Sequence, residues 1–84
     1  MKIKKLVPEG IFRDRNTISK ADWDTFKKNY LKKNPGTKSL ISKKDSIEYL
    51  IHKDDPKNAV IKYNPEDGEI YHDLKRKELY SYLR

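Results

Sequence analysis

The sequence has no cysteine, and its 84 residues include only three glycines, two histidines and one tryptophan. Without cysteine, the chain can form no disulfide bond, bind no zinc through thiolates and use no thiol nucleophile. Gly10, Gly36 and Gly68 each lie in a turn-like segment, so no glycine-rich phosphate-binding loop is present. Thiol enzymes, cysteine-ligated zinc proteins and P-loop proteins are therefore excluded.

Long hydrophobic runs are also missing. No segment approaches the roughly 20 apolar residues that a membrane-spanning helix requires. Residues 1–7 begin like a signal peptide, but no apolar stretch follows them. We therefore expect a cytoplasmic protein with no membrane partner, and a chain of this length predicts a single domain over residues 1–84 with a modest core.

Positive charge is what the sequence has in excess. Its 20 lysines and arginines face 13 aspartates and glutamates, which gives a formal net charge of +7. This excess favours polyanionic partners or acidic proteins. Lysine greatly outnumbers arginine, and arginine is the sharper sign of bidentate phosphate recognition. The net charge alone therefore does not distinguish a protein that binds polyanions from one that uses its charge only for solubility.

The strongest structural pattern is a β-hairpin within residues 58–74. Residues 64–68, Asn-Pro-Glu-Asp-Gly, have turn chemistry at every position. A four-residue loop pairs Tyr63 with Ile70 and Ile61 with His72. Because side chains alternate along a strand, one face is predicted to be inward and the other outward. The inward face comprises Ala59, Ile61, Tyr63, Ile70, His72 and Leu74, and the outward face comprises Val60, Lys62, Glu69, Tyr71 and Asp73.

A first helix is predicted to begin after Ser19. Ser19 is the expected N-cap, with Asp22 at the third helical position. Ile18 before the cap and Trp23 inside the helix match a hydrophobic staple. Trp23, Phe26, Tyr30 and Leu31 then follow helical spacing, and Asn34-Pro35-Gly36 ends the helix.

A second helix is predicted because residues 41–45, Ile-Ser-Lys-Lys-Asp, repeat the start of the first. Its buried stripe would be Ile47, Leu50 and Ile51. Residues 13–16 are interpreted as a charged loop, and a short C-terminal helix is expected from residue 74 or 75. The predicted fold class is α+β, with two N-terminal helices packed on the hairpin. A strand at residues 2–7 would extend it to a three-stranded antiparallel sheet.

Basic residues cluster on both sides of the hairpin in the sequence. Our leading hypothesis is a small nucleic-acid-binding domain that contacts the phosphates of RNA or DNA through these patches. Tyr71, beside Lys62, offers a ring for base stacking. The alternative interpretation of the same residues is a solvated lysine-rich face. The predicted nucleic-acid-binding residues are Lys27, Lys28, Lys32, Lys33, Lys62, Tyr71, Lys75, Arg76 and Lys77.

A second hypothesis is a metal-independent ribonuclease toxin. RNA cleavage needs a base, an acid and cations for the phosphate, and His72 with Lys62, Tyr71, Lys75 and Arg76 supplies such groups. His72 is the candidate catalytic residue, although a lone histidine on an inward face is more often a packing residue. An enzyme is therefore the less favoured interpretation.

Two resemblances accompany the ribonuclease hypothesis. The element order, size and basic charge are similar to small bacterial ribonuclease toxins of the RelE type. The hairpin from Ile61 to Ile70 resembles the strand-turn-strand of colicin-type tRNase domains. No specific motif carries either resemblance and at least one strand is missing, so we assign no family.

A third hypothesis is a phage- or plasmid-type interaction module or inhibitor that binds an acidic host protein. Tyrosine is enriched at protein interfaces, and the contact candidates are Tyr49, Tyr71, Tyr80 and Tyr82. His52 with Asp54 and Asp55, or His72 with Asp73, lacks a recognised metal-ligand spacing. We therefore predict no metal site and no cofactor.

Overall fold

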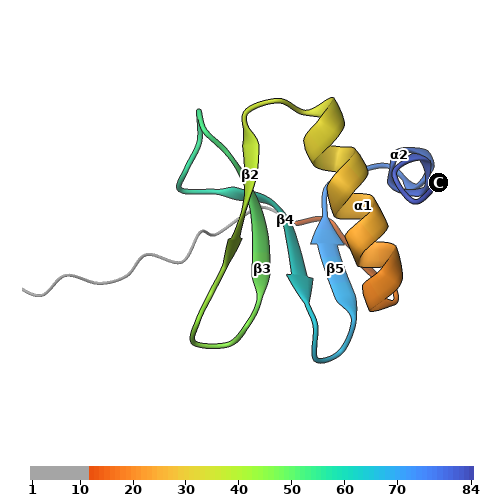
Figure 1. Cartoon of the computed structure of the whole chain (residues 1–84). Coiled ribbons are helices and arrows are strands. Elements are labelled where there is room, and N and C mark those ends of the chain that lie inside the picture. Colours follow the sequence, from red (N-terminus) through yellow and green to blue (C-terminus); the bar gives the residue numbers. More distant parts are fainter. Residues whose placement is uncertain (1–11) are drawn as a thin grey trace, which may run out of the picture.

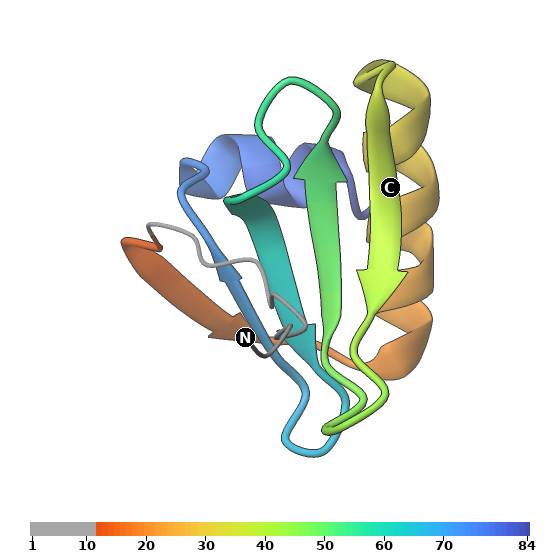
Figure 2. The same cartoon turned by 90° about the vertical axis from the view of Figure 1, so that its left-hand side faces the viewer.

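The structure is a computed structural model that describes residues 12–84. Their strands form a five-stranded antiparallel sheet in the order β1-β5-β4-β3-β2, and both helices lie on one side of it (Figure 1). Figure 2 looks onto the face of the sheet that carries no helix. The elements are β1 (Asp14–Thr17), α1 (Lys20–Lys33), β2 (Thr37–Ile41), β3 (Glu48–His52), β4 (Ala59–Asn64), β5 (Glu69–His72) and α2 (Arg76–Ser81).

The first predicted helix is confirmed as α1. Its N-cap Ser19 accepts a hydrogen bond from the backbone N–H of Asp22 at 3.0 Å, as the capping pattern indicated. The helix ends at Asn34, whose backbone N–H and side-chain amide both donate to the carbonyl of Tyr30, at 2.9 and 2.8 Å. Neither helix in the described part of the chain is long and apolar enough to cross a membrane.

The main core lies between α1, α2 and the sheet. The Trp23 ring stacks on Tyr63 with ring centroids 4.7 Å apart and on Phe26 at 5.8 Å. Complete burial of each large apolar side chain contributes about 1.5–3 kcal/mol. The buried members are Trp23, Phe26, Tyr30, Leu50, Ile61, Tyr63, Ile70 and Leu79.

The predicted hairpin is confirmed as β4 and β5. Tyr63 pairs with Ile70 and Asn64 with Glu69, as a four-residue loop requires. Gly68 closes this loop with a φ of 73°, and its N–H donates to the carbonyl of Asn64 at 2.8 Å. The Gly68 carbonyl accepts from the N–H of Ile18 at 2.8 Å, which ties the turn to the start of α1.

One residue of the predicted inward face lies elsewhere. Ile61, Tyr63, Ile70 and His72 are buried, but the pairing of β3 with β4 shifts register after Leu50. Leu50 pairs with Ile61 and Ile51 pairs with Ala59, so Val60 is the extra residue of a bulge. The bulge changes the alternation, and Ala59 packs with Tyr49 and Ile51 in a second small cluster.

The second predicted helix is wrong, and so is the fold class with two N-terminal helices. Its residues form part of a hairpin of β2 and β3. The residues that connect β2 to β3 form a turn. The Ser42 N–H donates to the Ile47 carbonyl at 2.9 Å, and the Asp45 carboxylate accepts from the Ile47 N–H at 3.2 Å. Ser46 has a φ of 62°, which breaks any helix there. The Ser-x-x-Asp pattern therefore forms a turn here, because serine and aspartate favour turns as well as helix N-termini.

Two smaller expectations also need correction. Residues 14–17 form the edge strand β1 rather than a loop. The C-terminal helix begins at Arg76, one or two residues later than expected, with Lys75 as N-cap. Leu79 is buried, but Tyr80 is 47% exposed and Tyr82 packs against Phe26 instead. The strand predicted at residues 2–7 lies outside the described residues.

Candidate nucleic-acid interface

A row of directly paired residues runs across the face of the sheet that the helices leave open. Directly paired residues share a face, and the neighbouring positions Leu50, Ile61 and Ile70 belong to the core against α1. The row therefore lies on the opposite face, which Figure 2 shows toward the viewer. In strand order it consists of Arg15, Tyr71, Lys62, Tyr49 and Leu40.

Tyr71 lies between two cations in this row. The Nζ of Lys62 is 5.0 Å from the centre of the Tyr71 ring, and the Cζ of Arg15 is 6.0 Å from it. Both distances are in the range of cation–π contacts. Phe12 adds a tilted ring with its centroid 6.1 Å from that of Tyr71. Tyr71 is half-buried, so part of its ring is open to solvent.

The carboxylate of Glu69 belongs to the same surface. The Tyr71 hydroxyl donates to Glu69 Oε1 at 2.7 Å, and this hydrogen bond raises the pKa of Tyr71 above its ordinary value. Arg15 Nε lies 3.6 Å from Glu69 Oε2. Within residues 12–84, Lys62 forms no ion pair with a carboxylate. The surface around Tyr71 is therefore positively charged and aromatic, and we name Arg15, Lys62 and Tyr71 the sheet-face triad.

Arg15 was not among the sequence-predicted site residues. Residues 13–16, Arg-Asp-Arg-Asn, show no strand pattern, and the sequence offers no sign that Arg15 pairs with Tyr71. The two positions are 56 residues apart along the chain and meet only because β1 adds to the edge of the hairpin. Only the sheet order brings this guanidinium to the candidate site.

The predicted lysine patches are not gathered into one surface. Lys27, Lys28, Lys32 and Lys33 lie on α1, on the opposite side of the sheet from Lys62 and Tyr71 (Figure 2). Lys75, Arg76 and Lys77 lie at the start of α2, which is also behind the sheet in that view. The sheet therefore separates Lys62 and Tyr71 from both groups of helix cations.

Lys27 also has a structural partner. Its Nζ donates to Oε2 of the buried Glu48 at 2.8 Å, while Trp23 Nε1 donates to Oε1 at 2.9 Å. Ser39 Oγ donates to Oε2 as well. Burial opposes ionisation of Glu48, but these three donors outweigh it, so the pKa of Glu48 is lowered. Lys27 is thereby committed to neutralising a buried carboxylate.

His72 shares a pocket of about 210 Å³ with Arg76 at the junction of β1, β5 and α2. The ring is 1% exposed, and both of its nitrogens are engaged. Nε2 lies 2.6 Å from Asn16 Oδ1, and Nδ1 accepts from the backbone N–H of Leu74 at 3.1 Å. Burial lowers the pKa of His72, which favours the neutral ring. Of its four predicted helpers, Arg76 lines this pocket, but Lys62 and Tyr71 lie on the other face of the sheet. Because both ring nitrogens of His72 are engaged within the fold, the structure does not favour the ribonuclease hypothesis.

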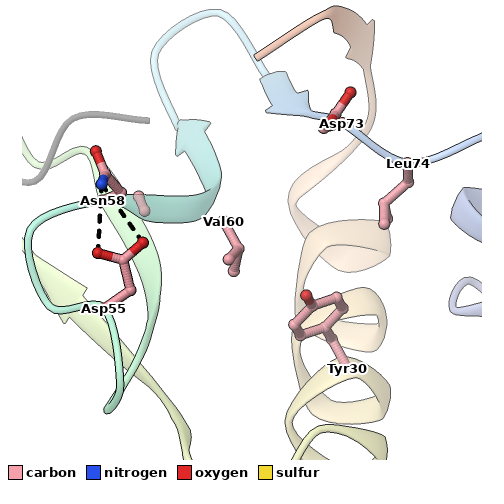
Figure 3. Close-up of a pocket in the computed structure, with 7 residues that line it drawn as sticks. Tyr30, Asp55, Asn58, Val60, Asp73 and Leu74 are labelled. Atoms are coloured by element: carbon pink, nitrogen blue, oxygen red, sulfur yellow. Dashed lines mark hydrogen bonds between the residues drawn. The ribbon is translucent and has the colours of Figure 1, made fainter. Parts of the chain in front are cut away.

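A second hollow, of about 340 Å³, lies between α1, the β3–β4 connection and the residues after β5 (Figure 3). Figure 3 shows the Asn58 amide bonded to both carboxylate oxygens of Asp55, at 3.3 and 3.4 Å. Asp73 and Tyr30 also line it. Two carboxylates repel phosphate, so this hollow does not extend the candidate interface.

No protein-family model, curated protein or solved structure matches this chain. Among residues 12–84, no three histidine, aspartate or glutamate side chains are placed to hold a metal ion.

Proposed function

We propose that this protein binds single-stranded nucleic acid on the face of its sheet that carries no helix. In this proposal Arg15 and Lys62 contact phosphates, and Tyr71 stacks on a base. The observation that supports it is the alternation of cation, aromatic ring and cation across β1, β5 and β4. Nonspecific single-strand binders combine a positive track with aromatic platforms in this way.

The shape of the surface favours a single strand over a duplex. The major groove of DNA admits an α-helix or a two-stranded ribbon, and a sheet of five strands is wider than either. Lys62 Nζ and Arg15 Cζ lie 5.0 and 6.0 Å from the centre of the Tyr71 ring, so both cations are close to one base-sized site. Only an unpaired base has a ring face free to meet a tyrosine between flanking cations.

The net charge of +7 adds to this local surface. Cations on α1 and α2 lie behind the sheet, on the opposite side from Tyr71. They strengthen the long-range attraction of a polyanion, which depends on the summed charge rather than on a contact. The proposal thus assigns contacts to the sheet-face triad and steering to the helix lysines.

The test is fluorescence anisotropy with labelled single-stranded RNA, single-stranded DNA and duplex DNA, at about 50 and 200 mM salt. We expect tighter binding to the single strands, weakened at the higher salt. Tyr71→Leu should lower affinity by about five- to 100-fold, the effect of losing one stacked base. Lys62→Gln should reduce the slope of log affinity against log salt by about 0.7.

The matched control is Lys32→Gln, which removes the same charge from α1. In a protein that carries Lys32→Gln, the Tyr71→Leu substitution should lower the affinity by the same factor as it does in the unmodified protein. Equal losses from Lys32→Gln and Lys62→Gln, with no loss from Tyr71→Leu, would assign binding to the net charge instead of the sheet face. Absence of binding at low salt, or binding indifferent to salt, would refute the nucleic-acid function altogether.

A further inference from the structure

The strand β2 forms one edge of the sheet, and it pairs only with β3 among the described strands. Its five residues pair in regular register, without a bulge. An edge strand presents backbone N–H and C=O groups along its free side, which can pair with another strand. The outer side of β2 is therefore a template for strand addition.

Two hydrogen bonds define which backbone groups point outward. Lys53 N–H donates to the Gly36 carbonyl at 2.9 Å, just before β2, and Ser42 N–H donates to the Ile47 carbonyl at 2.9 Å, just after it. In an antiparallel ladder, every second residue of a strand bonds the same neighbour. Gly36 and Ser42 are an even number of positions apart in the sequence, so Lys38 and Leu40 between them also point their N–H and C=O groups toward β3.

The remaining positions of β2 therefore carry the outward groups. The Thr37 N–H is occupied, because it donates to the Asn34 carbonyl at 3.1 Å. The N–H groups of Ser39 and Ile41 point away from β3. These two residues, with the carbonyl groups beside them, define the free pairing edge.

The side chains of this edge differ from those of the opposite edge. On β2, Leu40 is 42% exposed and Ile41 is 57% exposed. On β1, the sequence Asp-Arg-Asn-Thr is short and polar, which is how proteins usually protect an edge. Two exposed aliphatic side chains on an edge strand favour contact with a partner.

The charge around the edge indicates the chemistry of that partner. Lys38 lies in β2, Lys43 and Lys44 follow its end, and Lys53 lies beside its start. Within residues 12–84 none of these four lysines forms an ion pair. A second copy of the chain would bring its own four lysines to the same edge and is disfavoured by repulsion. An acidic segment is complementary.

We propose that the outer edge of β2 binds an extended acidic segment of another protein as an added strand. Backbone hydrogen bonds to Ser39 and Ile41 align the segment. Its central residues lie beside Leu40 on one face of the sheet and beside Ile41 on the other, and its acidic ends meet the lysines at the two ends of β2. This surface is separate from the sheet-face triad, so the proposal does not depend on nucleic-acid binding.

The test uses the full chain and a capped peptide probe with the sequence Glu-Asp-Val-Thr-Val-Thr-Val-Asp-Glu. Titration followed by amide nuclear magnetic resonance should shift the Ser39 and Ile41 signals most. Ile41→Pro removes one outward N–H and leaves the ladder to β3 intact, since proline is tolerated on edge strands. It should weaken binding by about tenfold. Ile41→Thr, which keeps the N–H, should weaken it less.

Peptide controls keep the test valid if Ile41→Pro does not fold. The same peptide, N-methylated both at its central valine and at the threonine that follows, loses an N–H on each of its two edges. In either register it therefore loses a backbone bond to β2, and it should bind at least about tenfold more weakly. A version with lysine in place of each acidic residue should also fail. Equal binding of either control peptide would overturn the proposal. So would shifts confined to residues outside β2, or a protein that forms dimers through β2 in the absence of peptide.

Discussion

The ammonium group of Lys27 lies 2.8 Å from a carboxylate oxygen of Glu48, and this ion pair joins α1 to β3. The Glu48 side chain is 8% exposed and that of Lys27 is 27% exposed, so water screens the pair only in part. In the sequence, Lys27 is one of four lysines in the second half of a helix, with nothing to distinguish it. In the fold it is the counter-ion of a buried charge.

Replacing Lys27 by alanine should destabilise the protein. Loss of one partner leaves the Glu48 charge buried and poorly compensated, which costs about 3 kcal/mol. We expect the free energy of unfolding, measured by urea denaturation, to fall by about this amount. Lys28→Ala removes a neighbouring exposed charge and should change it by at most about 0.5 kcal/mol.

The decrease in the free energy of unfolding at acidic pH provides a second test of Lys27→Ala. The pKa of Glu48 is lowered from its ordinary 4.5, so its stabilisation is complete above that pH and is lost as pH falls through the folded-state pKa. Without Lys27 that pKa should rise, and the loss should begin at higher pH. If the free energy of unfolding decreases over the same pH range in both proteins, Lys27 does not compensate the charge of Glu48.

The burial of His72 predicts a separate pH dependence. Burial lowers its pKa from the ordinary 6.5, so the unfolded chain takes up a proton at higher pH than the folded one. Its contribution is therefore complete above about pH 6.5 and declines as pH falls toward the folded-state pKa. His72→Gln should remove this decline in the free energy of unfolding, whereas His52→Gln should retain it. An unchanged decline in His72→Gln would disprove the assignment.

Gly68 should tolerate no side chain. Its φ is 73°, and a Cβ there would lie 2.9 Å from the backbone carbonyl oxygen of Ile18. Because the obstacle is backbone, Gly68→Ala should lower the free energy of unfolding by about 1–3 kcal/mol in thermal or urea unfolding. Glu66→Ala, on the exposed part of the same turn, should change it by at most about 0.5 kcal/mol. Equal stability of the two variants would contradict this account.

The elements that the sequence predicts correctly are those with local chemistry. The helix α1 is specified by its N-cap Ser19 and by the spacing of Trp23 and Phe26, which lie within a few residues of one another in the sequence. The turn that ends at Gly68 likewise fixes the register of β4 and β5. In both cases the interacting groups are close along the chain, so the pattern and the structure carry the same information.

Residues 42–51 were predicted wrongly because their local pattern fits two structures. A serine followed by an aspartate suits a helix start or a turn, and buried runs such as Tyr49 to Ile51 suit a helix or a strand. All four residues from Glu48 to Ile51 are buried, since one side of β3 faces α1 and the other faces a second cluster. Packing on both sides selects the strand.

The sequence by itself determined an excess of positive charge, one capped helix and one hairpin, because composition and short-range hydrogen bonding need no knowledge of distant residues. Only the tertiary structure decided where that charge lies. A sheet has two faces and two edges, and the order of its strands assigns Lys62 and Arg15 to one face, Lys27 to a buried pair behind it and Lys38 to an edge.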